Sequence, residues 1–329
     1  MTDFNKLFGE FGKIRAGVIG DIMLDTYWWG HVERISPEAP VPVVTLDKRE
    51  YRIGGAGNVA LNLASLGASV ATFSIIGNEE EGKILDHLLQ DNRIDTGYLL
   101  KSDSRITTNK SRIISRNQHM MRLDSETTKD ITEQEEDQLI SQVKNYLDRE
   151  KPQVIIFEDY NKGVLTPRVI REVIGLCNHR QIVTAVDPKR KNFFAYDGVT
   201  IFKPNLKEVK EGLNLLLEEI HLPALQDIHL QLTEKLNHPI SFITLSEKGI
   251  FYQDSDQSGI IPSHLRSIAD VSGAGDTVIA VGSLVYAATK DIRLMAEIAN
   301  IAGGLVCEEV GTVAINKEKL LQECRLLLK

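Results

Sequence analysis

The stretch Asp270-Val-Ser-Gly-Ala-Gly-Asp-Thr277 leads directly into the apolar run Val278-Ile-Ala-Val-Gly-Ser-Leu-Val-Tyr286. The apolar run is typical of a buried helix, so the small residues before it form the turn at the start of that helix. N–H groups at a helix start have no intrahelical acceptor and carry the positive end of the helix dipole. The turn therefore predicts a site that binds an anion.

Asp276 places a carboxylate inside this predicted anion site. Phosphoryl transfer to a hydroxyl needs N–H donors for the moving phosphate and a base for the alcohol, and the turn with Asp276 would provide both. Alternatively, Asp276 is only the capping residue of a helix that follows a glycine-rich turn. The eight residues favour the first interpretation, and the rest of the chain has to decide between the two.

The composition is that of a soluble globular protein. The chain has 329 residues, of which 42% are hydrophobic and 26% charged, enough for two average domains or one large α/β domain with an insertion. A net charge of −8 disfavours nucleic acid as a partner. There is no long apolar run for a membrane span and no secretory signal, and Cys177, Cys307 and Cys324 lie far apart. We therefore expect a cytoplasmic protein that binds neither nucleic acid nor membrane.

Five short apolar runs predict strands that are covered on both faces. They are residues 16–20, 154–157, 182–186, 199–202 and 241–245. Helical patterns lie between them: Thr132-Glu-Gln-Glu135 is a capping box, and Thr166-Pro167 begins a helix that continues to Cys177. This alternation predicts an α/β fold with a mostly parallel central sheet, in which ligands bind beyond the carboxyl ends of the strands.

Two segments, about 27–52 and 101–124, break the alternation. The first holds three prolines between positions 37 and 42, and prolines confine strands to sheet edges, so we expect a small exposed β-sheet here. The second segment has a net charge of +4, from Lys101, Arg105, Lys110, Arg112, Arg116 and Arg122 against Asp103 and Asp124. These cations either protect exposed strand edges or belong to a lid that closes over an anionic substrate.

The stretch Gly54-Gly-Ala-Gly-Asn58 also has two interpretations. Its spacing fits a dinucleotide fingerprint, but no long apolar strand precedes it, and a lone match of this kind is weak. Alternatively, the glycines let the backbone approach a small ligand while Asn58 offers a donor and an acceptor to sugar hydroxyls, which is the interpretation we favour. The sequence has no Gly-x-x-x-x-Gly-Lys-Ser/Thr motif, which excludes a P-loop kinase.

Together these motifs resemble the PfkB, or ribokinase, superfamily of sugar kinases, and within it the branch that acts on D-glycero-β-D-manno-heptose 7-phosphate. The similarity runs nearly from end to end, over residues 20–25, 35–44, 54–60, 115–118, 122–124, 159–163, 187–189, 204–208 and 270–279. The last stretch is shared by the whole superfamily. The narrower Ser-Pro-Glu-Ala-Pro-Val-Pro and Ser-Arg-Asn-Gln stretches point to the heptose branch.

The resemblance implies a ribokinase-like three-layer fold, with residues 1–329 as one kinase domain and a β lid formed by about 27–52 and 101–124. It also implies an ATP site with Mg²⁺. Asp276 would be the base, the N–H groups of Gly273, Ala274 and Gly275 would bind the γ-phosphate, Asn205 would face the nucleotide phosphates, Glu208 would orient Mg²⁺ through water, and Ser246 and Gly249 would line the nucleotide site.

The same resemblance implies a sugar site and a cation site. Asp25, Gly55 and Asn58 would hold the sugar hydroxyls, Arg122, Asp159 and Lys162 would meet the sugar and its 7-phosphate, and Asp270 and Ser272 would bind a monovalent cation such as K⁺. The sequence departs from the usual pattern at three positions, with Glu158 in place of serine, Lys203 in place of threonine and Ser272 in place of threonine. None of these changes removes a group that the chemistry needs.

The implied activity is the ATP-dependent phosphorylation of O1 of the heptose 7-phosphate to the 1,7-bisphosphate, a step toward ADP-heptose and the lipopolysaccharide core. Relatives often carry a second, nucleotidyl-transferring domain, for which this chain leaves no room, so we expect a stand-alone kinase that forms a homodimer through its lid sheets. Three alternatives stay open: a fructokinase-like or other PfkB hexose kinase, a nicotinamide-dependent oxidoreductase that rests only on the glycine match, and a silent sugar-binding regulator. The last would be expected to have lost Asp276 or Glu208, and both are present.

Overall fold

The computed structural model describes residues 2–116, 118–216, 219–264 and 266–328. Within these ranges the main sheet has nine strands in the order β13-β12-β11-β10-β9-β8-β1-β4-β5, and all pairs are parallel except those that β12 makes with β11 and β13. The strands are β1 (Arg15–Gly20), β4 (Ser69–Gly77), β5 (Leu99–Ser102), β8 (Val154–Glu158), β9 (Val183–Asp187), β10 (Ile201–Phe202), β11 (Ile240–Thr244), β12 (Ile250–Gln253) and β13 (Ser258–Ile261).

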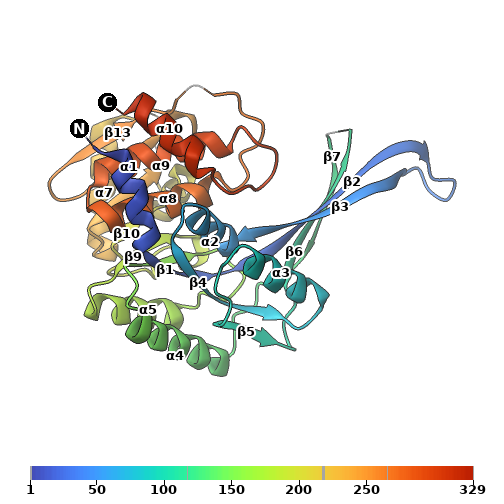
Figure 1. Cartoon of the computed structure of the whole chain (residues 1–329), viewed down its shortest axis with the longest axis horizontal. Helices are drawn as coiled ribbons and strands as arrows, with labels where there is room; N and C mark the ends of the chain where they lie inside the picture. The colour runs from blue at the N-terminus through green and yellow to red at the C-terminus, as the bar shows by residue number, and fades with distance from the viewer. Residues whose placement is uncertain (1, 117, 217–218, 265, 329) are drawn as a thin grey trace.

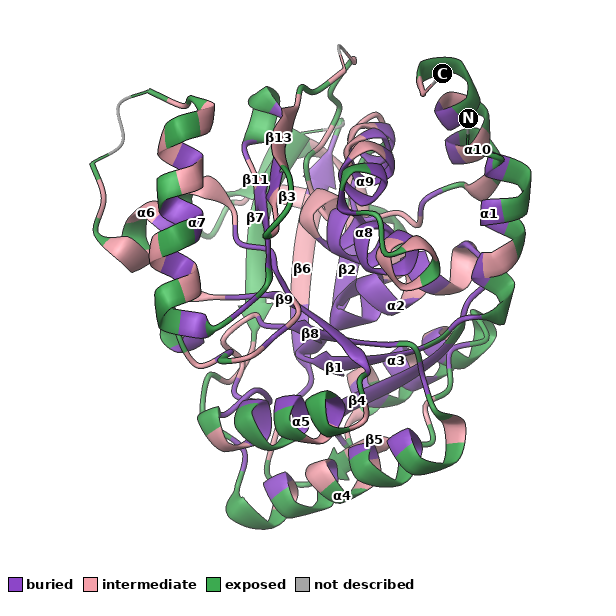
Figure 2. Cartoon of the chain, turned by 90° about the vertical axis from the view of Figure 1, so that its left-hand side faces the viewer, coloured by how far each residue is buried: buried purple, intermediate pink, exposed green. Residues whose placement is uncertain are grey.

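Helices cover both faces of this sheet, as Figures 1 and 2 show. One apolar core cluster draws on α1 (Phe4–Glu10), α2 (Ala56–Ser65), α3 (Glu80–Asp91), α8 (Ala274–Thr289), α9 (Ile292–Val306) and α10 (Lys317–Leu327). The other draws on α4 (Glu133–Glu150), α5 (Pro167–His179), α6 (Leu206–Leu213) and α7 (Leu222–Leu236). Because both faces are covered, the central strands can be apolar throughout. The predicted α/β fold with a mostly parallel sheet is therefore confirmed.

The predicted strands are present, with one that is shorter than expected. The run 199–202 supplies only β10, because the N–H of Val199 donates to the carbonyl of Tyr196 in a turn before the strand begins. The capping box at α4 is formed as predicted: the hydroxyl of Thr132 accepts from the N–H of Glu135, and the carboxylate of Glu135 accepts from the N–H of Thr132.

A second sheet of four strands extends from the main body like an arm (Figure 1). Its order is β3-β2-β6-β7, and we call these strands the lid: β2 (Ile22–Ile35), β3 (Pro42–Gly55), β6 (Thr108–Ser115) and β7 (Gln118–Ser125). β2 begins buried in the core and ends exposed. Pro37 and Pro40 lie in the turn between β2 and β3, and Pro42 is the first residue of β3, positions at which no ladder N–H is needed.

The boundaries of the second predicted lid segment, 101–124, differ from the structure. Residues Leu99–Ser102 pair in parallel with β4 and so belong to the main sheet, where Lys101 forms an ion pair of 2.8 Å with Asp86. The first lid strand of this segment begins only at Thr108. Asn117, in the predicted Ser-Arg-Asn-Gln stretch, lies outside the described residues.

In the part of the chain that the structure describes, we find no helix both long enough and apolar enough to cross a membrane.

The capping box of α4 generates a stability prediction. Replacing Thr132 with alanine leaves the N–H of Glu135 without its acceptor, and we expect the free energy of unfolding to fall by about 1 kcal/mol. Ser141→Ala is the matched control, because Ser141 is exposed within the same helix and alanine has the higher helix propensity. Urea denaturation followed by circular dichroism measures both variants. Equal effects of the two substitutions would contradict the capping role.

Candidate active site

The carboxyl ends of β1, β8 and β9 form the floor of the candidate active site. Gly20, Glu158 and Asp187 are in register at these three strand ends, and α8 packs against β8 and β9. In parallel sheets the carboxyl ends of the strands are where ligands bind. The start of α8 therefore lies above the edge at which the sequence predicted the site.

The turn before α8 has the geometry of an anion site. Gly273 is the N-cap with φ +78°, and a Cβ there would lie 2.8 Å from Nδ2 of Asn58, so both the backbone and the close contact require glycine. The first intrahelical bond within α8 runs from Thr277 to Gly273 at 2.9 Å, and the N–H of Ala274 donates to the carbonyl of Val271 at 3.3 Å. Ala274 and Gly275 both lie in the first helical turn, where N–H groups have no intrahelical acceptor, and the N–H of Ala274 already donates to Val271.

Asp276 lies buried directly beneath this turn. Its Oδ2 accepts a hydrogen bond of 2.8 Å from Nδ2 of Asn58, and its Oδ1 accepts one of 2.7 Å from the hydroxyl of Tyr160. Burial raises the pKa of Asp276, while the hydrogen bonds from Asn58 and Tyr160 pull it back down. A carboxylate whose pKa is raised but which is held in place by two donors is suited to accept a proton from a hydroxyl.

Two lysines, the buried Lys203 and the half-buried Lys189, lie near Asp187 at the carboxyl edge of the sheet. Nζ of Lys203 lies 2.6 Å from Asp187, and Nζ of Lys189 lies 3.3 Å from Asp187 and 2.8 Å from Glu208. Burial alone would raise the pKa of Asp187, but the two lysines hold it below its usual value. A Cβ on Gly275 would come within 3.5 Å of both Nζ of Lys203 and Oδ2 of Asp187, so the ion pair of these two residues lies next to the predicted anion site. A phosphate bound at the turn would meet helix N–H groups and fixed positive charge together.

Asn205 and Glu208 form the capping box of α6. Oδ1 of Asn205 accepts from the N–H of Glu208 at 2.9 Å, and Oε2 of Glu208 accepts from the N–H of Asn205 at 2.8 Å. Oε1 of Glu208 is paired with Lys189. Both oxygens of Glu208 thus have partners within the chain, and its role as a partner of hydrated Mg²⁺ stays a prediction.

Ser246 and Gly249 lie in the turn that follows β11. Gly249 has φ +98°, and a Cβ there would fall 1.9 Å from the carbonyl oxygen of Ile261. The turn itself therefore requires this glycine. Ser246 is exposed at the carboxyl end of β11, at the same edge of the sheet as Asp187 and Asn205.

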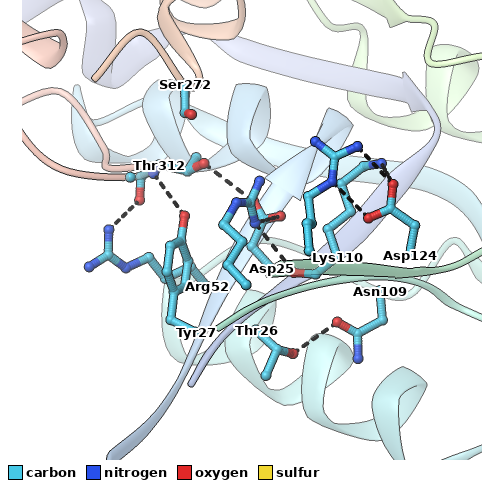
Figure 3. A network of polar contacts seen from close by, with 12 residues as sticks. Asp25, Thr26, Tyr27, Arg52, Asn109, Lys110, Asp124, Ser272 and Thr312 are labelled. Carbon is cyan, nitrogen blue, oxygen red and sulfur yellow. Dashed lines mark hydrogen bonds and ion pairs between the residues drawn. The ribbon is translucent and has the colours of Figure 1, made fainter. Parts of the chain in front are cut away.

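Asp25 lies where β2 leaves the core for the lid (Figure 3). Its Oδ1 forms an ion pair of 2.6 Å with Arg112 of β6, and its Oδ2 accepts a hydrogen bond of 3.3 Å from the hydroxyl of Thr312. Arg112 is a lid cation that the sequence did not single out as a site residue. Gly55 is the N-cap of α2 with φ +59°, and a Cβ there would collide with the carbonyl of Asp21. The backbone of the turn is therefore enough to explain glycine at this position.

Three of the predicted sugar-phosphate residues do not contact Asp276. Asp159 is buried and accepts hydrogen bonds from Tyr196 and Asn192, and burial raises its pKa to about 6. Lys162 forms an ion pair of 2.7 Å with Glu126. Arg122 binds both oxygens of Asp124, its neighbour on β7, at 2.9 and 3.0 Å.

Asp270 organises the loop in front of α8. Its Oδ1 accepts from the N–H and the hydroxyl of Ser272, and its Oδ2 accepts from the N–H of Gly311. Burial alone would raise the pKa of Asp270, but these hydrogen bonds keep it below its usual value. No group of three or more metal-ligating His, Cys, Asp or Glu side chains occurs among the described residues.

Tyr160 and Asp21 are among the residues of the site that the sequence reasoning missed. Tyr160, which touches Asp276, follows β8, and Asp21 follows β1. Asp21 is a buried carboxylate whose oxygens accept from the N–H groups of Tyr160, Lys162 and Val164, so it holds the loop that carries Tyr160. Their signal is a polar residue one or two positions after a buried parallel strand.

A buried carboxylate under a helix start, with two lysines beside it at the carboxyl edge of a parallel sheet, defines a phosphotransferase site. The profile of the pfkB family carbohydrate kinases matches residues 14–319, so the chain belongs to this family and is an ATP-dependent carbohydrate kinase. The predicted resemblance to the superfamily is thereby confirmed.

Several curated relatives carry the name bifunctional protein HldE. The protein of that name from Geobacter sulfurreducens is 38% identical over 316 residues, which are 96% of this chain and 64% of the relative. The one from Methylobacillus flagellatus is 39% identical over 310 residues, 93% of this chain and 62% of the relative. The chain thus spans less than two thirds of the length of these relatives.

Solved structures confirm the ribokinase-like fold. Phosphofructokinase-2 from Escherichia coli in complex with potassium superposes with a TM-score of 0.79 at 18% identity, covering 96% of this chain and 100% of that one. Ribokinase from Arabidopsis thaliana, complexed with ribose and ATP, superposes with a TM-score of 0.73 at 14% identity, covering 94% and 99%.

The contact between Tyr160 and Asp276 generates a prediction about pH dependence. In Tyr160→Phe the carboxylate loses a donor that lowers its pKa, so the acidic limb of the rate profile should move to higher pH. Turnover should fall about tenfold, the rate equivalent of one hydrogen bond to a charged group. Tyr146→Phe is the control, because it removes a buried hydroxyl that donates to the carbonyl of Ala16, away from the site. An unmoved acidic limb in Tyr160→Phe would show that the phenol does not act on the base.

Proposed function

We propose that this chain transfers a phosphoryl group from ATP to O1 of D-glycero-β-D-manno-heptose 7-phosphate, giving the 1,7-bisphosphate. The observation that carries the proposal is the hydrogen bond of 2.8 Å between Asn58 and Asp276, because it joins a predicted sugar-binding amide to the predicted base at the start of α8. The relatives named HldE support the heptose branch, in which this step leads to ADP-heptose and the lipopolysaccharide core.

In this proposal the acceptor hydroxyl lies next to the hydrogen-bonded pair of Asn58 and Asp276. Asp276 accepts its proton, and Asn58 and Tyr160 fix the orientation of the carboxylate. The N–H of Gly275 and the charge of Lys203 stabilise the negative charge that builds up on the moving phosphoryl group. ATP supplies that group, and Glu208 would hold the hydrated Mg²⁺ that accompanies it.

The proposed assembly is one kinase domain that pairs through its lid. Six large apolar side chains are exposed on the lid and its connecting turn: Ile35, Val41, Leu46, Met120, Met121 and Leu123. Burying them between two lids would remove apolar surface from water, which supports a homodimer. We place the protein in the cytoplasm and assign a monovalent cation such as K⁺ to the loop of Asp270 and Ser272, in line with the potassium complex of the structural relative.

A second candidate, a fructokinase-like or other PfkB hexose kinase, is favoured by one observation. The lid cations are already paired with carboxylates: Lys110 with Asp124 and Glu126, Arg112 with Asp25, and Arg122 with Asp124. Cations whose charge is neutralised by carboxylates of the same chain need not bind a phosphate group on the sugar. The substrate panel described below separates the two candidates.

The base assignment predicts the behaviour of Asp276→Asn. Turnover should fall by about 10²–10⁴, the usual contribution of a positioned base, while ATP binding stays nearly intact. A coupled ADP-release assay and nucleotide titration calorimetry measure the two quantities, with Asp137→Asn, an exposed acid on α4, as the control. Near-normal turnover in Asp276→Asn would return Asp276 to the role of a structural cap.

If the lid binds the 7-phosphate of the sugar, Arg122→Ala should lower the specificity constant for the sugar phosphate. The specificity constant for the heptose 7-phosphate should fall by about 10- to 100-fold, the worth of a charge-assisted hydrogen bond, with the response to ATP unchanged. Arg34→Ala removes an exposed cation of β2 that lies outside the basic segment and is the matched control. The parent protein should use glucose, fructose and ribose poorly. If it phosphorylates a free hexose as well as any sugar phosphate, the heptose assignment fails and the hexose kinase is supported.

A further inference from the structure

Glu158 is a buried carboxyl that the rest of the chain does not satisfy. It is completely buried at the last position of β8, and neither of its oxygens has a hydrogen-bond partner within the described residues. Buried polar groups are normally paired, since leaving one unpaired in a protein interior costs free energy. A carboxyl left in this state therefore calls for a functional explanation.

The register of the sheet places Glu158 in the floor of the active site. It pairs with Gly20 on one side and with Asp187 on the other, so Glu158 and Asp187 project from the same face at neighbouring strand ends. That face is covered by α8, which carries Asp276 and packs against β8 and β9. The next residue, Asp159, projects from the opposite face and bonds to Tyr196.

The charged groups around Glu158 leave no cation for it. Lys203 is 2.6 Å from Asp187, and Lys189 is shared between Asp187 and Glu208. Burial, and then the negative charges of Asp187 and Asp276, raise the pKa of Glu158 well above its usual value, against the opposing effect of Lys189 and Lys203. The hydroxyl of Tyr160, which donates to Asp276, also faces this region, whereas the hydroxyl of Tyr196 bonds to Asp159 on the opposite face; a charge on Glu158 raises the pKa of both tyrosines. With Glu158 neutral, Asp276 is the carboxylate without a cationic partner in this cluster.

We propose that Glu158 is a positioning residue of the phosphoryl-transfer site and that it acts in its neutral, protonated form. In that form it adds no negative charge beneath the anion site, so the phosphoryl group can approach and Asp276 alone serves as base. Ionised Glu158 would repel the phosphate and raise the proton affinity of Asp276. The inference rests on the proposed function, because it assigns a charge state to the floor of that same site.

The proposal predicts that the enzyme loses activity as Glu158 ionises at alkaline pH. Glutamine has the shape of glutamic acid but cannot ionise, so Glu158→Gln should keep turnover within about threefold of the parent near neutral pH. Its alkaline limb should lie at higher pH than that of the parent. Glu136→Gln, which neutralises another buried glutamate on α4, is the matched control and should leave the alkaline limb where it is in the parent.

Thermal unfolding provides a readout that does not depend on the substrate. A carboxyl whose pKa is raised in the folded protein binds its proton more tightly there than in the unfolded chain, so its contribution to stability falls as pH rises from the usual to the raised value. Glutamine does not titrate, so Glu158→Gln does not lose stability in this way. The Tm of the variant relative to the parent should therefore increase with pH between the usual and the raised pKa of Glu158. Glu136→Gln should show no such increase.

The outcomes separate this inference from the proposed function. If Glu158→Gln folds normally but loses most of its turnover at every pH, the carboxylate form is the working form and the inference is overturned. A Tm difference that does not change with pH also overturns it, since Glu158 would then be ionised in the folded protein. If no sugar phosphate is a substrate but the Tm difference rises with pH, the charge state of Glu158 stands and only the proposed substrate fails.

Discussion

The candidate active site depends on a buried carboxylate, that of Asp276, which is held in one orientation by hydrogen bonds and forms no ion pair with the described residues. Two donors, the amide of Asn58 and the hydroxyl of Tyr160, reach it from different parts of the chain. Asn58 is in α2, at the end of the lid, and Tyr160 is in the loop after β8. The carboxylate of Asp276, the proposed base, therefore keeps both donors only when three segments that are distant in sequence have packed together.

Asp21 is the support behind this arrangement. It is buried at the end of β1, and three backbone N–H groups of the loop 160–164 donate to it. Burial nevertheless raises the pKa of Asp21, because the charged carboxylate that holds the loop is removed from water. Neither Lys189 nor Lys203 neutralises Asp21, because both lysines form ion pairs with Asp187. A phosphate bound at the start of α8 would lie near them there. Asp187 is thus held by cations, whereas Asp21 and Asp276 are held by hydrogen-bond donors.

The sequence predicted those features that follow from local pattern. The helix start at 273–277, the parallel sheet and the capping box at Thr132 need only spacing and residue type. Side-chain direction at the strand ends was harder, because successive residues of a strand point to opposite faces. The motif 159–163 drew attention to Asp159, whereas the register turns Glu158 toward α8 and Asp159 toward Tyr196. Pairings such as Arg112 with Asp25 depend on the alignment of β2 with β6, which no local pattern specifies.

The lid and the anion site are joined by one loop, residues 310–312. Arg52 of β3 donates to the carbonyls of Val310 and Thr312, and the hydroxyl of Tyr27 of β2 accepts from the N–H of Thr312 (Figure 3). The same loop reaches Asp270 in front of α8 through the N–H of Gly311. β2 runs without interruption from the buried core into the exposed lid, and its residues Asp25 and Tyr27 both contact Thr312 of this loop. The lid and the start of α8 are therefore connected through one set of hydrogen bonds that centres on residues 310–312.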